Sequence, residues 1–136
     1  MESFDNITFS KVLDKSRIVL PDGMPLVWTQ KLLGQKSSKR VAGMDLTLAL
    51  CDLAEKNGYN IGFYGGHEGS LDKLEEKIIG LYPKIKIKYL FSPPFRHLNS
   101  AENFEVDKEI NLKNLQILFV GIGCPKQEYW MNEKSQ

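Results

Sequence analysis

Polar side chains suited to anion binding follow a predicted strand near the end of the chain. The apolar run 117–120 is bounded by turn residues, as expected for a strand covered on both faces in a parallel sheet. Gly121-Ile122-Gly123-Cys124-Pro125 then predicts a sharp turn, and Pro125 suits the first turn of a helix. Lys126-Gln127-Glu128 falls in that first turn. Because a helix N-terminus presents N–H groups and a positive dipole end, this segment predicts an anion site, for phosphate above all.

Two other glycine-bearing turns carry groups that can take part in chemistry. Pro21-Asp22-Gly23 places a carboxylate after a short predicted strand, where it can serve as a general base. Pro-Asp-Gly is also simply a good turn sequence, so both interpretations stay open. Gly65-Gly66 lets the backbone approach a ligand closely, and a plain tight turn explains this pair about as well.

Strands and helices alternate along the chain, which predicts how these turns are positioned. Helices are predicted at 7–15, 24–33, 45–57, 70–82, 100–111 and after 125, and strands at 17–20, 60–64, 85–91 and 116–120. This order predicts an α/β fold: a Rossmann-like parallel sheet with helices on both faces, forming a single domain over residues 1–136. Right-handed crossovers place the carboxyl ends of all the strands at one edge, so the three turns should meet there.

Apolar spacing predicts which face of each helix is buried. In the helix 45–57 the stripe is Leu46, Ala49, Leu50 and Leu53, and Cys51 is interpreted as a core or near-core residue. In the helix 70–82 the stripe is Leu71, Leu74, Ile78 and Leu81.

Composition narrows the function classes. Eighteen basic residues balance seventeen acidic ones in 136 residues, which disfavours a nucleic-acid binder that works by bulk charge. The sequence shows no apolar run of about 18 residues and no secretory signal, and its two cysteines are far apart, so we expect a cytoplasmic, reduced protein. The dinucleotide fingerprint is incomplete because Lys126 occupies its third glycine position, and no P-loop or metal-ligand spacing is present.

A set of ordered motifs resembles the WecG/TagA/CpsF glycosyltransferases, glycosyltransferase family twenty-six. The motifs are PDGMPLVW at 21–28, KRVAGMDL at 39–46, GFYGG at 62–66, FSPPF at 91–95 and FVGIGCPKQEYW at 119–130. The resemblance covers about residues 4–130. Members of the family usually carry a strand before the first helix and continue past the last motif, often into a basic tail that docks on the membrane. The chain therefore resembles the core of the family and is expected to be short at both ends.

The resemblance implies a function. The family transfers a sugar of the N-acetylmannosamine type from a UDP-sugar to an acceptor linked to undecaprenyl diphosphate, for teichoic acid, common antigen or capsule synthesis. It implies inverting, metal-independent chemistry without a cofactor, at the inner face of the bacterial membrane, and it is compatible with a homo-oligomer. The alternative is a catalytically incomplete remnant of the family that only binds the nucleotide.

The resemblance also assigns roles to residues. Asp22 is expected to be the base, and Arg40 is expected to grip the diphosphate that leaves with UDP. Lys126 and Gln127 would steady the same leaving group, while Glu128 is either a second carboxylate or only a first-turn cap partner. The remaining expected substrate contacts are Gly23, Gly65, Gly66, Gly123 and Pro125.

Overall fold

The computed structural model describes residues 7–16, 32 and 42–134. Contacts along the chain divide it into two compact units, one formed by Leu50–Gln127 and the other by Met1–Ala49 with Glu128–Gln136. The predicted strand 17–20 and almost all of the predicted helix 24–33 lie outside the described residues. The single-domain organisation stays a prediction.

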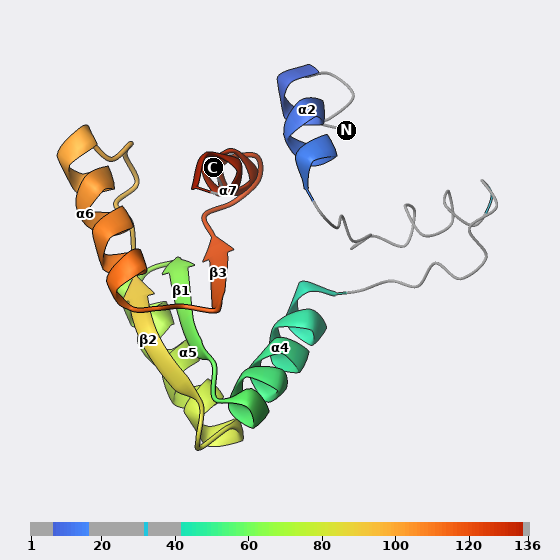
Figure 1. Ribbon diagram of the computed structural model, residues 1–136, viewed down its shortest axis with the longest axis vertical. Coiled ribbons are helices and arrows are strands. Elements are labelled where there is room, and N and C mark those ends of the chain that lie inside the picture. Colours follow the sequence, from blue (N-terminus) through green and yellow to red (C-terminus); the bar gives the residue numbers. More distant parts are fainter. Residues whose placement is uncertain (1–6, 17–31, 33–41, 135–136) are drawn as a thin grey trace. The chain divides into compact units, whose positions relative to one another are not determined.

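A parallel sheet forms the centre of the Leu50–Gln127 unit (Figure 1). Its strands are β1 (Asn60–Gly65), β2 (Lys86–Phe91) and β3 (Ile117–Gly121), in the order β2-β1-β3. β1 pairs with both neighbours in parallel, with Tyr64 beside Phe91 and Gly65 beside Gly121. The predicted α/β, Rossmann-like fold with a parallel sheet is therefore confirmed.

Helices connect the strands as the alternating pattern requires. α4 (Gly43–Asn57) precedes β1, α5 (Glu68–Leu81) joins β1 to β2, α6 (Ser100–Leu112) joins β2 to β3, and α7 (Lys126–Lys134) follows β3. α5 packs against β2 and lies behind the sheet in the view of Figure 1. Near the start of the chain, α2 (Ile7–Lys15) has the bounds that the sequence predicts. Helix α5 begins at Glu68 rather than Ser70, because His67 takes the extended N-cap conformation.

The core of the Leu50–Gln127 unit is built around β1, in which every residue from Ile61 to Gly65 is buried. Aromatic side chains stack across the ladders: ring centroids lie 4.9 Å apart for Phe63 and Phe119, and 5.5 Å apart for Tyr64 and Phe91. This packing anchors the ends of the three strands relative to one another, and so fixes where the segments after them begin.

The buried face of α4 differs from the predicted apolar stripe. Cys51 and Ala54 are fully buried, whereas Leu53 is 45% exposed and Leu46 is also exposed. The interpretation of Cys51 as a core residue is confirmed, and burial raises the pKa of its thiol. On α5, Leu71 and Ile78 are buried as predicted, but Leu81, at the end of the stripe, is exposed.

Candidate functional site

Three segments begin where the strands end, and we call them together the carboxyl edge: Gly65-Gly66, Ser92–Leu98 and Gly121–Gln127. They start side by side because the three strands run parallel and end in register, Gly65 beside Gly121 and Tyr64 beside Phe91. Two of the three predicted glycine turns are thus confirmed at one edge. The third, Pro21-Asp22-Gly23, lies outside the described residues.

Glycines shape the carboxyl edge. Gly65 has a φ of 127°, and a Cβ there would overlap the backbone carbonyl of Gly121. Gly66 and Gly123 also have positive φ, 77° and 87°, yet no described atom lies within 4 Å of a Cβ built on either one. The first position is closed by a neighbouring backbone. Among the described residues the other two face open space, which leaves room for a ligand to approach the main chain.

Helix α7 starts at this edge. The Gln127 amide donates to the Gly123 carbonyl at 3.0 Å, and the peptide bond between Cys124 and Pro125 is cis. Pro125 lies just before the helix rather than within it, since α7 begins at Lys126. Lys126 is exposed, and Gln127 and Glu128 follow it, half-buried, in the first turn. A cationic side chain and a helix N-terminus are therefore presented together, a combination that favours anions.

Side chains from the β2 segment contribute contacts that the sequence did not reveal. The Ser92 hydroxyl donates to the Gly66 carbonyl at 2.6 Å and so ties the segment after β2 to the turn after β1. The ring of Phe95 lies 5.1 Å from the ring of His67, centroid to centroid, and Phe95 is 90% exposed. Neither contact has a local sequence signal, because each joins residues more than one element apart.

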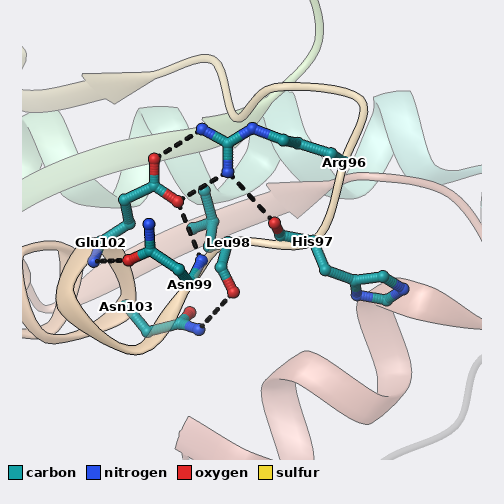
Figure 2. Close-up of polar contacts among 6 residues, drawn as sticks. All are labelled: Arg96, His97, Leu98, Asn99, Glu102 and Asn103. Atoms are coloured by element: carbon teal, nitrogen blue, oxygen red, sulfur yellow. Dashed lines mark hydrogen bonds and ion pairs between the residues drawn. The ribbon is translucent and has the colours of Figure 1, made fainter.

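An ion pair closes the end of the same segment (Figure 2). The two terminal nitrogens of Arg96 lie 2.7 and 2.6 Å from the two carboxylate oxygens of Glu102. Glu102 also accepts from the Asn99 amide at 2.8 Å, and the Asn99 side chain accepts from the Glu102 amide at 2.9 Å, which completes a capping box at the start of α6. The guanidinium and the Asn99 amide together lower the pKa of Glu102 to about 2.

The carboxyl edge brings together six of the residues that the sequence nominated, and Glu128 follows them in α7. The six are Gly65, Gly66, Gly123, Pro125, Lys126 and Gln127. Asp22, Gly23 and Arg40 lie outside the described residues. Within residues 7–16, 32 and 42–134, no group of three or more His, Cys, Asp and Glu side chains is placed to hold a metal ion. In the same part of the chain, no helix combines the length and apolar character that a bilayer crossing requires.

Comparison with known proteins defines the class. The family model described as "Glycosyl transferase WecG/TagA/CpsF family" matches residues 1–136. The chain therefore belongs to the WecG/TagA/CpsF family of glycosyltransferases, as its motifs predicted.

Two curated relatives share the printed name N-acetylglucosaminyldiphosphoundecaprenol N-acetyl-beta-D-mannosaminyltransferase. The protein from Bacillus spizizenii is 28% identical over 132 residues, covering 97% of this chain and 49% of the relative. The protein from Bacillus subtilis strain 168 is 31% identical over 121 residues, covering 89% of this chain and 45% of the relative. The chain thus spans about half the length of the curated relatives that it matches.

Proposed function

We propose that this chain is the donor-binding core of a glycosyltransferase. It would transfer a sugar of the N-acetylmannosamine type from a UDP-sugar to an acceptor linked to undecaprenyl diphosphate. The single observation that carries the proposal is the carboxyl edge, where Gly66, Gly123 and the N-terminus of α7 present open backbone beside Lys126. The names of the two relatives support the sugar and the lipid-linked acceptor.

The carboxyl edge suits the diphosphate of the donor. A helix N-terminus and a lysine ammonium both favour negative charge, and the glycines at 66 and 123 leave the main chain open to phosphate oxygens. The Gln127 side chain can donate to a phosphate oxygen or accept from a sugar hydroxyl. These groups would hold the leaving group in place while the bond to the sugar breaks.

The proposed reaction is a direct displacement that inverts the anomeric carbon and uses no metal ion. The acceptor hydroxyl oxygen attacks that carbon, its proton passes to the Asp22 carboxylate, and the bond between the sugar and UDP breaks. The electron pair of this bond leaves on the β-phosphate oxygen. Arg40, Lys126 and Gln127 would offset that negative charge, a role that needs preorganised donors and cations.

The acceptor in the relatives' names is a sugar joined through a diphosphate to undecaprenol, a long apolar chain suited to a lipid bilayer. We therefore place the reaction at the inner face of the bacterial membrane, in teichoic acid, capsule or related polymer synthesis, with the protein bound peripherally. Sedimentation with vesicles that contain anionic lipid and the lipid-linked acceptor tests this placement. Protein that stays in the supernatant at every lipid concentration would contradict it.

Sugar transfer by the full chain tests the proposal. Asp22→Asn keeps the size of the side chain and removes the base, so we expect turnover to fall by about a hundredfold or more. Asp52→Asn is the matched control, because Asp52 is an aspartate of α4 whose only described ion pair is an exposed one with Lys56. Binding of UDP without transfer by the unmodified chain would favour the alternative, a nucleotide-binding remnant. Equal turnover in Asp22→Asn and the control would refute the assigned base.

A further inference from the structure

The segment Ser92–Leu98 is fastened at both ends. At its start, the Ser92 hydroxyl donates a hydrogen bond to the Gly66 carbonyl at 2.6 Å. At its end, Arg96 pairs with Glu102, and the Asn103 side chain donates to the Leu98 carbonyl at 3.2 Å. Two consecutive prolines, Pro93 and Pro94, stiffen the part between these anchors. These contacts and the two prolines restrict the conformations open to the segment, although much of it lies at the surface.

The guanidinium of Arg96 is engaged in fixing this segment (Figure 2). Beyond its two contacts with Glu102, its Nη1 donates to the His97 carbonyl at 3.2 Å. Exposed ion pairs contribute little to stability, but a two-pronged arginine–carboxylate contact fixes geometry. Glu102 belongs at the same time to the capping box of α6, so the pair connects the segment to the first turn of a helix.

Phe95 is what this arrangement presents. Phe95 is 90% exposed, and its ring lies next to the ring of His67. The residue that follows it in the sequence is Arg96, which pairs with Glu102. An exposed aromatic ring on a fixed backbone suits binding, because little side-chain freedom is lost when a ligand packs against it.

We propose that Arg96 and Glu102 are positioning residues that hold Phe95 at the carboxyl edge for contact with the nucleoside part of the donor. This inference rests on the proposed function. The diphosphate would lie at the start of α7, which follows β3. The ring of Phe95 contacts the ring of His67, which comes directly after Gly66 in the turn following β1, the strand beside β3. Neighbouring strands lie about 5 Å apart, so an extended nucleoside diphosphate bound at α7 is long enough to bring its nucleoside to this ring.

The test separates the ion pair from the helix cap. Glu102→Gln keeps an oxygen that can accept from the Asn99 amide, so the capping box survives while the charge facing Arg96 is lost. Arg96→Gln removes the guanidinium that pairs with Glu102, and Phe95→Ala removes the ring proposed to contact the nucleoside. Lys56→Gln is the matched control, because it removes an exposed ion pair, Lys56–Asp52 at 2.6 Å, close to the amino end of β1.

Two measurements on the full chain decide the proposal. In ¹⁵N relaxation without ligand, we expect order parameters at Phe95 and Arg96 near 0.85 in the unmodified chain, falling toward 0.6 in Glu102→Gln and Arg96→Gln. In calorimetric titration with UDP, Phe95→Ala, Glu102→Gln and Arg96→Gln should each weaken binding by about threefold to tenfold. Adding Arg96→Gln to Phe95→Ala should cause no further loss, because both act through the same ring.

Each outcome is decisive. Unchanged order parameters in Glu102→Gln and Arg96→Gln would overturn the positioning role whether or not UDP binds. Unchanged UDP affinity in these variants, with normal binding by the unmodified chain, would overturn the contact with Phe95 but leave the proposed function intact. Absence of UDP binding by the unmodified chain would overturn the proposed function and the donor contact together. A loss of affinity equal to theirs in Lys56→Gln would show a general effect of charge removal and would also overturn the inference.

Discussion

Gly65 and Gly121, the last residues of β1 and β3, face each other so closely that a Cβ on Gly65 would overlap the Gly121 carbonyl. Gly65 also has a φ of 127°, a conformation that side chains disfavour. Both facts require glycine at the point where two turns of the carboxyl edge begin.

Gly65→Ala should lower the free energy of unfolding by about 3 kcal/mol, combining backbone strain with the overlap on a neighbouring backbone. The control is Gly66→Ala, where φ is also positive but the space around a Cβ is open, so we expect a loss of about 1 kcal/mol. Urea denaturation of both variants measures the difference. Equal losses would show that the contact with Gly121 does not constrain position 65.

Much of the fold could be predicted because it follows from local patterns. Buried parallel strands appear as short apolar runs, and the turns after them contain glycine, as at Gly65 and Gly121. The buried face of α4 could not be predicted in the same way. Spacing favoured a leucine stripe, whereas the buried positions are Cys51 and Ala54, small residues that allow a helix backbone to approach its neighbours closely.

Part of the candidate site could also be predicted from local sequence, and part could not. The features of α7 that favour an anion could be predicted because strand, glycine turn and helix are consecutive in the sequence. The Ser92–Gly66 hydrogen bond and the Phe95–His67 contact join separate elements and depend on the order of strands in the sheet. One part of the contacts around Glu102 did have a sequence signal. Asn99 is followed three residues later by Glu102, a pattern that predicts a capping box.

Glu102 should make stability depend on pH only under acidic conditions. Its pKa in the folded chain is about 2, below the ordinary value, so its contribution is present above about pH 4.3 and is lost as pH falls toward 2. The melting temperature of the unmodified chain should therefore exceed that of Glu102→Gln by a constant amount from pH 5 to 8. The difference should shrink steadily below pH 4. A difference that persists at pH 2 would contradict the assigned pairing.

Tyr89 should respond to alkaline pH. Its hydroxyl is buried without a described hydrogen-bond partner, and burial followed by the nearby Glu109 charge raises its pKa. Tyr89→Phe removes an unsatisfied polar atom, so we expect it to be neutral or to stabilise by about 1 kcal/mol at pH 7. Because the unfolded phenol ionises near pH 10 and the folded one does so only higher, the unmodified chain should lose stability above about pH 10. Urea denaturation at pH 7 and above about pH 10 measures the free energy of unfolding of both proteins. We expect this free energy to fall less at alkaline pH in Tyr89→Phe than in the unmodified chain.

Lys126 should contribute to nucleotide binding through its charge. Lys126→Gln is expected to weaken UDP binding by about threefold to tenfold at low salt, and by less at high salt, since exposed charges are screened. Lys108→Gln on α6 is the control, because Lys108 is also exposed and pairs only loosely with Glu105, at 3.7 Å. Titration calorimetry at two salt concentrations measures both variants. Equal effects of the two substitutions would point to net charge rather than to a site at α7.

Mapping UDP onto the backbone amides by NMR tests the central claim most directly, namely that the carboxyl edge binds the donor diphosphate. The account predicts that the largest shifts occur at Gly66, Gly123, Lys126 and Gln127, with small shifts at Asn60 and Lys86, where β1 and β2 begin. Shifts concentrated at Asn60 and Lys86, with Gly123–Gln127 unchanged, would contradict it.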